Sequence, residues 1–170
     1  LNGWLGYTYA EANYFNEPSG WHHPNFDRTH TLNMVGNIEL TNELEISTAI
    51  TQSSGNPFTK ILGRAYDWEQ NLDSETYWYP VDSYIVGEKN TERYNNYFRV
   101  DIGMTRKKGN LFGLNYDTYW QVMNVTRHLN VLSYAYRTKT DPFTGNRIGV
   151  ERRAVPMFPL IVTFGIKFDF

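Results

Sequence analysis

The sequence predicts an all-β chain whose strands run up and down, antiparallel, as a segment of a transmembrane β-barrel. Apolar and polar residues alternate with a period of two over stretches of about 9 to 11 residues, the length that crosses a bilayer at the tilt of a barrel strand. Short turns and long connections follow one another along the chain, as in such barrels. Aromatic residues reach 16% of the 170 residues, a surplus that interfacial girdles would use.

Composition excludes several classes of function. The formal net charge is -2 and the chain has no basic run, so nucleic-acid binding is not expected. Cysteine is absent, which excludes disulfides, thiolate metal sites and cysteine nucleophiles. No apolar run is long enough for a transmembrane helix. The chain begins at Leu1, without Met or a signal peptide, and we expect a single domain that is a piece of a longer exported precursor.

The first third of the chain predicts a strand, a loop and a hairpin. Residues 2–11 alternate and are rich in aromatics, whereas residues 13–28 are polar with two prolines and a glycine, which is typical of a loop. Residues 30–40 and 44–51 alternate on either side of a tight turn at 41–43. This pattern predicts a β-hairpin of membrane-crossing length.

The middle of the chain predicts a long loop and a second hairpin. Residues 52–96 have little sustained periodicity, and we expect a long outside loop, which a compact domain would rarely hold. Residues 97–105 and 111–125 alternate around a predicted turn at 106–110. Four charged residues in these hairpins alternate with the apolar ones, so they fall on the face expected to line the lumen. This placement avoids the cost of a charge facing hydrocarbon. The four residues are Glu39, Arg99, Asp101 and Asp117.

The last segment predicts the sixth strand, over residues 156–170. Before it, residues 130–136 are expected to continue the preceding strand beyond the membrane, 139–146 to form a loop tip, and 149–154 to lead into the final strand. One parity of that strand is wholly apolar, and the other is small or charged. The apolar set is Leu160, Val162, Phe164, Ile166, Phe168 and Phe170.

Five motifs mark the starts and ends of the predicted strands. They are Asp27-Arg28-Thr29-His30-Thr31-Leu32-Asn33, Gly55-Asn56-Pro57-Phe58-Thr59, Tyr97-Phe98-Arg99-Val100-Asp101, Val122-Met123-Asn124-Val125 and the closing Phe164-Gly165-Ile166-Lys167-Phe168-Asp169-Phe170. Over nearly the whole chain they resemble, in order, the C-terminal barrel strands of TonB-dependent receptors. Two positions depart from that pattern, since Phe58 stands where Tyr is usual and Val125 where Leu is usual.

The resemblance implies that residues 1–170 are the C-terminal portion of a barrel of roughly 22 strands, without its plug and earlier strands. It implies the outer membrane of a Gram-negative bacterium and import of a scarce nutrient, such as a metal chelate, an oligosaccharide or a peptide, without a cofactor. The implied partners are the remaining strands and plug from the same protein or a second chain, TonB and its inner-membrane energising complex, outer-membrane lipid and lipopolysaccharide, the barrel-assembly machinery and a surface lipoprotein. The assembly machinery would read Phe164, Phe168 and Phe170.

Aromatic outside loops can close over a ligand at a barrel mouth, and we expect substrate contacts from five residues. They are Trp21, His22, Trp68, Trp78 and Tyr79. His22, His23, Asp27 and His30 fall within nine positions, but a loop sequence supplies no convergent geometry, so no metal site is predicted. No spacing of carboxylates singles out a general acid and a nucleophile. No catalytic residue is predicted, and the protein is not expected to be an enzyme.

Two other functions stay open. In the first, the barrel is a structural part of a surface protein complex and performs no active transport, which a missing plug and coupling motif upstream would indicate. In the second, the chain is a soluble carbohydrate-binding β-sandwich whose long aromatic loop is the binding site. The sandwich would need no detergent and would have no lipid-facing band.

Overall fold

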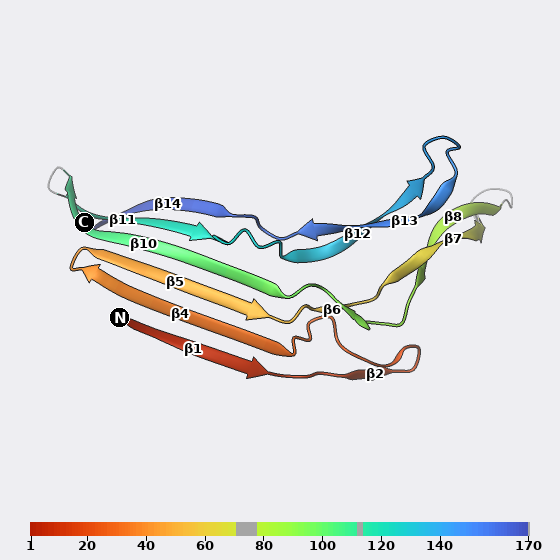
Figure 1. The fold of residues 1–170 in the computed structure, drawn as a ribbon, viewed down its shortest axis with the longest axis horizontal. Coiled ribbons are helices and arrows are strands. Elements are labelled where there is room, and N and C mark those ends of the chain that lie inside the picture. Colours follow the sequence, from red (N-terminus) through yellow and green to blue (C-terminus); the bar gives the residue numbers. More distant parts are fainter. Residues whose placement is uncertain (71–77, 112–113, 170) are drawn as a thin grey trace.

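The computed structural model describes residues 1–70, 78–111 and 114–169. Within these ranges every regular element is a strand and every pairing is antiparallel, which confirms the predicted all-β antiparallel class. The principal sheet has six strands in the order β1-β4-β5-β10-β11-β14 (Figure 1). Their bounds are Asn2–Tyr9, His30–Thr41, Leu44–Ser53, Tyr97–Leu111, Leu114–Met123 and Ile161–Asp169.

These six strands are the six predicted from the alternation, and they follow one another across the sheet in chain order. The sheet is open, because β1 and β14 form its two edges and do not pair with each other in the described chain. The connection between β4 and β5 lies at one end of the sheet, together with both chain ends, whereas the long connections extend from the opposite end (Figure 1). We call the latter the loop end.

The long connections contain strands of their own, in four small two-stranded sheets. The pairs are β2 (Tyr14–Asn16) with β3 (Gly20–His22), β6 (Pro57–Phe58) with β9 (Glu92–Arg93), β7 (Ile61–Gln70) with β8 (Trp78–Val86), and β12 (Val131–Thr140) with β13 (Arg147–Pro156). The prediction of a loop without structure over residues 52–96 is therefore wrong. A hairpin that stands away from the sheet has no reason to separate apolar from polar faces, so it leaves no clear alternation in the sequence.

Two further boundaries differ from the prediction. Residues 106–110 belong to β10 rather than to a turn, since a bulge between Arg106 and Gly109 absorbs an extra residue and pairing continues to Leu111. Residues 130–136 do not extend β11, since 131–136 form part of β12, and 149–154 lie in β13, its partner strand. The final strand starts only at Ile161, because Pro156 still belongs to β13 and Pro159 lacks the N–H that pairing requires.

The register divides the six-stranded sheet into two faces. On the apolar face, hydrophobic residues stand opposite one another across neighbouring strands, as in the row Met34, Ile50 and Val100. Some aromatic side chains of this face lie toward the ends of the strands, with Tyr7 and Tyr9 near the loop end. At the opposite end Tyr116 pairs with Phe168, and their ring centroids are 6.0 Å apart.

The opposite, polar face carries the charged residues for which lumenal parity was predicted. Arg99 forms an ion pair with Asp101, and the Lys107 ammonium lies 2.9 Å from the Glu45 carboxylate on the neighbouring strand. Asp117 and Lys167 stand opposite each other on β11 and β14. The alternation in the sequence therefore corresponds to a physical separation of the two faces.

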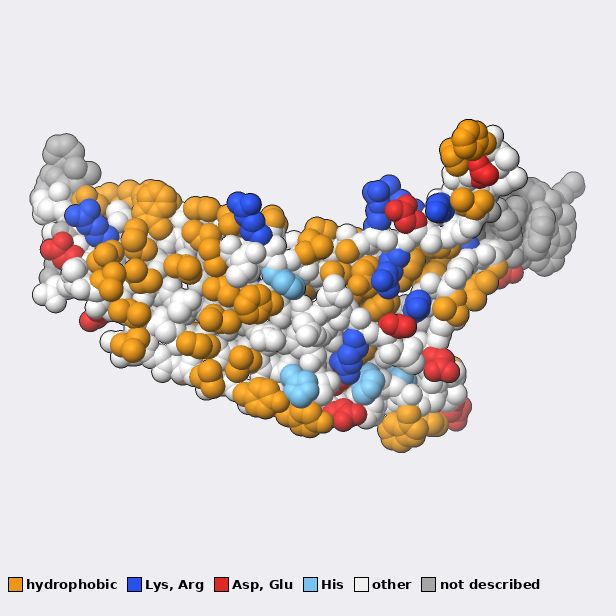
Figure 2. Space-filling view, viewed as in Figure 1, with side chains coloured by type: hydrophobic (Ala, Val, Ile, Leu, Met, Phe, Trp, Pro, Cys, Tyr) orange, Lys and Arg blue, Asp and Glu red, His pale blue; other side chains and the backbone are white. Residues whose placement is uncertain are grey.

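Neither face of the six-stranded sheet is covered by a second layer in the described chain. Large apolar residues of the sheet are exposed, for example Trp120 at 47% and Phe164 at 51%. Figure 2 shows hydrophobic side chains gathered over the sheet. The buried hydrophobic residues of the described ranges are Phe58 and Val131, both in the connections. No helix in the part of the chain described is long and apolar enough to cross a membrane.

Candidate functional site

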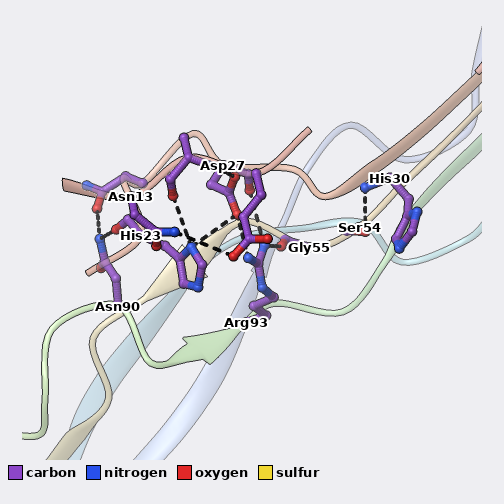
Figure 3. Close-up of polar contacts among 11 residues, drawn as sticks. Asn13, His23, Asp27, His30, Ser54, Gly55, Asn90 and Arg93 are labelled. Carbon is purple, nitrogen blue, oxygen red and sulfur yellow. Dashed lines mark hydrogen bonds and ion pairs between the residues drawn. The ribbon is translucent and has the colours of Figure 1, made fainter. Parts of the chain in front are cut away.

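Hydrogen bonds and ion pairs gather at the base of the long connections, at the loop end of the sheet. Asp27 lies at their centre and is only 3% exposed. Its carboxylate accepts hydrogen bonds from the Ala12 amide (3.0 Å) and from the Arg93 guanidinium. Arg93 also donates to the Gly55 carbonyl oxygen (3.1 Å). One ion pair thus joins the connection after β1 to the connection between β5 and β10 (Figure 3).

These contacts keep Asp27 ionised. Burial by itself raises the pKa of a carboxyl group, but the hydrogen bonds from Arg93 and Ala12 and the charge of Arg93 outweigh burial, so the pKa of Asp27 is lower than usual. His23 lies beside it, with Nδ1 3.6 Å from the Asp27 carboxylate and donating to the Ala12 carbonyl oxygen (3.1 Å). We call Asp27 and Arg93 the loop latch.

Asn90 makes a second junction between the same connections. It is 5% exposed and has a φ of 55°, a left-handed conformation that Asn tolerates better than most residues. Its side-chain amide donates to the His23 carbonyl oxygen and to Asn25 Oδ1, both at 2.6 Å. Its backbone N–H donates to Thr59 Oγ1 (3.1 Å). The backbone N–H and the side-chain amide of Asn90 thus hold the two connections together.

Arg28 attaches these connections to the sheet. Its Nε donates to Asn56 Oδ1 (2.8 Å) and its Nη1 to Ser53 Oγ (2.9 Å) at the end of β5. The guanidinium carbon also lies 5.7 Å from the ring centroid of Tyr97, the first residue of β10. Because Ser53 and Tyr97 belong to the polar face by register, Arg28 lies over that face at its loop end.

The connection after β11 is held in the same manner. The Asp101 carboxylate accepts from the Asn124 backbone N–H (2.9 Å), and the Asn124 side chain donates to the His128 carbonyl oxygen (3.1 Å). The Asn130 side chain exchanges two hydrogen bonds with the Phe98 backbone, at 2.9 and 2.8 Å. A side-chain amide thus replaces a strand partner at the start of β10, and four of the five sequence motifs contribute hydrogen bonds at this end of the sheet.

Three aromatic rings pack above the latch. Phe58 and Tyr94 come from the connection between β5 and β10 and Tyr134 from β12, with ring centroids 4.5 to 5.2 Å apart. Arg152 lies over the Tyr134 ring, 4.2 Å from its centroid. Burial, together with the neighbouring Tyr136 and Tyr134, raises the pKa of Tyr94. This aromatic cluster is the small hydrophobic core of the connections.

A pocket of about 500 Å³ opens beside the aromatic cluster. Its polar lining residues include Asn25, Asn56 and Lys89, and Tyr136 contributes to its wall. The Tyr136 hydroxyl is buried and has no hydrogen-bond partner among the described residues. Aromatic walls with amide groups and one cation suit binding of a polar ligand. Within the described ranges no three His, Asp or Glu side chains converge to hold a metal ion.

Of the residues predicted to contact substrate, Trp21 and His22 are not among the residues that line this pocket. Trp21 is 74% exposed on β3 and packs against Phe15, with ring centroids 5.5 Å apart. His22 is buried at 9% exposure, and its Nδ1 is 3.1 Å from the Gly20 carbonyl oxygen. Trp68 lies on β7, and Trp78 and Tyr79 on β8, but the side chains of these three fall outside the described part of the structure.

Of the residues predicted as the assembly signal, Phe164 and Phe168 lie on the apolar face of β14, paired with Trp120 and Tyr116. Phe170 falls outside the described residues. Sequence reasoning missed Asn25, Lys89, Tyr94 and Tyr136 as pocket residues, because it favoured tryptophans in loops over residues beside the strand ends. The motif that contains Asn56 was the available signal.

Comparisons with known proteins identify no relative of this chain: no protein-family model, curated protein or solved structure matches it. The family therefore remains a prediction from the five sequence motifs, and any function must be argued from the geometry.

Proposed function

We propose that this chain forms the C-terminal part of the barrel wall of an outer-membrane TonB-dependent transporter in a Gram-negative bacterium. The two-faced sheet is the observation that carries the proposal. Its apolar face exposes large hydrophobic side chains from five of the six strands, while the charged residues for which lumenal parity was predicted lie on the other face. Lipid outside and a wet lumen inside would suit both faces at once.

Two features of the sheet support a membrane-spanning role. The strands have 8 to 15 residues, enough to cross the apolar part of a bilayer when tilted. Aromatic side chains toward both ends of the apolar face resemble the girdles that flank the lipid-facing band of a barrel. Continuous apolar patches of this kind are rare on proteins that water surrounds.

The edges of the sheet require partners. An unpaired strand edge in hydrocarbon costs several kcal/mol per backbone group, and β1 and β14 each have only one neighbour in the described chain. In the proposed transporter the remaining strands of the barrel, from the same protein or a second chain, pair with these edges. The plug then occupies the lumen against the polar face.

In this mechanism the long connections capture the nutrient, and the energising complex pulls on the plug through TonB so that the ligand passes along the polar face. The loop latch and the Asn90 junction hold the connections over the mouth in a defined arrangement, which lowers the ordering cost of binding. The chain supplies wall and loops and performs no chemical step.

The experiment that tests the proposal uses the full-length protein in its native membrane. We expect it to fractionate with the outer membrane, and to migrate faster on electrophoresis when it is not boiled, because a closed barrel resists detergent. A water-extractable protein without this heat-dependent shift would contradict the proposal and favour the carbohydrate-binding β-sandwich. That alternative also requires a second sheet over the apolar face, and the described residues place none there.

The structural-barrel alternative shares this topology, so a second measurement separates it. Uptake of candidate nutrients is compared in cells with and without TonB, at equal amounts of the protein in the outer membrane. Transport predicts that uptake is lost without TonB. Unchanged growth and uptake, with the protein required only for assembly of a surface complex, would favour the structural role.

A further inference from the structure

A second pocket lies at the loop end of the sheet, between the connection from β11 to β12 and the connection from β13 to β14. The two connections are held together by hydrogen bonds from the Met157 N–H to the Asn130 carbonyl oxygen (2.7 Å) and from the Asn124 side chain to the Phe158 carbonyl oxygen (3.5 Å). The pocket has a volume of about 490 Å³. It does not belong to the aromatic cluster described above, and its lining residues come from these two connections and from Pro156 at the end of β13.

This pocket continues the apolar face of the sheet. Leu160 lines it and has the same parity as Val162 and Phe164, which point to the apolar face. The His128 ring, also in the lining, contacts Phe98 edge-on with centroids 5.9 Å apart, and Phe98 has apolar-face parity on β10. The pocket therefore lies at the border between the apolar face and the long connections.

The lining combines apolar surface with an uncompensated positive charge. Phe158 is 78% and Leu129 59% exposed, although both line the pocket. Arg127 is exposed, and its guanidinium makes no hydrogen bond or ion pair with any described residue. No Asp or Glu occurs in the lining. An arginine beside apolar side chains is complementary to an amphipathic anion.

The backbone presents Arg127 in an unusual conformation. Its φ is 55°, and Asn124, three residues earlier, has a φ of 53°. The left-handed region is uncommon for an arginine and is favoured by residues such as Gly and Asn. The hydrogen bond from the Arg127 N–H to the Asn124 carbonyl oxygen (2.9 Å) closes this turn. The turn fixes the point from which the guanidinium reaches the pocket.

We propose that this pocket binds a phosphorylated acyl glycolipid of the outer leaflet. The phosphate pairs with Arg127, with His128 beside it, and an acyl chain lies on Leu129, Phe158 and Leu160. This inference rests on the proposed membrane orientation, which places the loop end at the outer surface. A water-borne anion would use the charge but would leave the apolar lining unused, whereas a lipid uses both and reaches the pocket along the apolar face.

The test titrates full-length protein in mild detergent with lipid A, and counts bound lipid by native mass spectrometry. Arg127→Ala is expected to weaken lipid A binding about tenfold, the loss typical of one charge-assisted hydrogen-bonded pair, and Arg127→Lys to recover part of the affinity. The matched control is Arg106→Ala. Arg106 is also exposed and has apolar-face parity, but it lies toward the opposite end of β10, so its loss should leave lipid A binding unchanged.

Two further ligands identify which part of the lipid is recognised. Lipid A without its phosphates should bind weakly and should not distinguish Arg127→Ala from the wild type. Inorganic phosphate alone should compete poorly. Equal lipid A binding by the wild type and Arg127→Ala would overturn the inference. So would displacement of lipid A by inorganic phosphate at a concentration equal to that of lipid A.

The design separates this inference from the proposed function. Each variant is first checked for the heat-dependent mobility shift, so that misfolded protein is not scored as a loss of binding. If the wild type shows the shift and outer-membrane fractionation but Arg127→Ala binds lipid A normally, only the lipid pocket is wrong. If the wild type lacks both properties, the membrane proposal itself has failed.

Discussion

The six-stranded sheet exposes large apolar side chains, whereas the connections at its loop end bury polar ones. Trp120 and Phe164 are about half exposed on the sheet. In the connections, Asp27 and Asn124 are 3% and 4% exposed, yet both have hydrogen-bond partners. The sheet therefore depends on surroundings to cover it, while the base of the connections supplies its own partners. The same chain uses two different sources of stability.

This contrast has a physical consequence for function. A wall whose apolar face is covered from outside can keep its opposite face polar, since the chain itself need not bury either one. Loops that stand beyond such a wall cannot rely on an apolar core, and here they are held by an ion pair, by side-chain amides and by one aromatic cluster. Charged substitutions should therefore lower stability on the apolar face of the sheet only. Loss of a hydrogen bond should lower stability mainly at the loop end.

The largest expected effect tests the two faces against each other. Ile102→Arg places a charge on the apolar face, and we expect it to reduce the free energy of unfolding in lipid vesicles by about 2 to 4 kcal/mol, as for other lipid-facing barrel positions. The control is Gln121→Arg on the polar face; Gln121 pairs with Gly103, the residue after Ile102. This substitution should change the free energy of unfolding by less than about 0.5 kcal/mol. Urea titration of the full-length protein measures both, and equal losses would break the comparison.

The next effect concerns the loop latch. Asp27→Asn removes the charge that Arg93 pairs with, and we expect local stability of the connections to fall by about 2 kcal/mol, less than for a fully buried pair because Arg93 is 31% exposed. Glu92→Gln is the control, since the Lys60–Glu92 pair is about half exposed on both sides and should contribute little. Limited proteolysis of the connections measures the difference. Equal cleavage rates in the two variants would show that the latch does not hold them.

The sheet could be predicted from the sequence because one periodicity determines it. Each of its strands alternates, and alternation fixes which residues share a face. The connections could not be predicted in the same way. The hairpin of β7 and β8 has no buried face to impose an alternating pattern. In β10 the bulge interrupts the alternation, so the run from Arg106 to Asn110 resembles a turn although it belongs to the strand.

The candidate site was only partly visible for a related reason. Asp27, Arg28, Asn56, Asp101 and Asn124 were singled out within motifs, and the structure brings them to one end of the sheet. Their partners, such as Arg93 and Asn90, lie more than sixty residues from Asp27 or from His23 in the chain. No local pattern carries that information, because such pairs depend on which loops meet in space.

A smaller effect probes how side chains fill the polar face. The Tyr119 ring lies over Gly165 on the neighbouring strand, and a Cβ at that glycine would clash with the ring. Gly165→Ala should therefore displace the ring and cost about 1 kcal/mol. In the double variant with Tyr119→Ser the clash is absent, so the two substitutions should not be additive. Additive losses in urea titration would mean that the ring does not occupy this space.

The smallest expected effect is the pH dependence of the latch. The folded protein holds the pKa of Asp27 below its usual value, so the stabilisation is complete above the pKa of the unfolded chain, about 3.9. It is lost as the pH falls through the lower pKa of the folded state. Hydrogen exchange of the Ala12 amide, which donates to Asp27, should show weaker protection at about pH 2 than at pH 5. The change should be smaller than that caused by Asp27→Asn at pH 5, since neutral Asp27 still accepts hydrogen bonds. If protection of the Ala12 amide changes between pH 2 and pH 5 as much in Asp27→Asn as in the wild type, the pH dependence comes from a group other than Asp27.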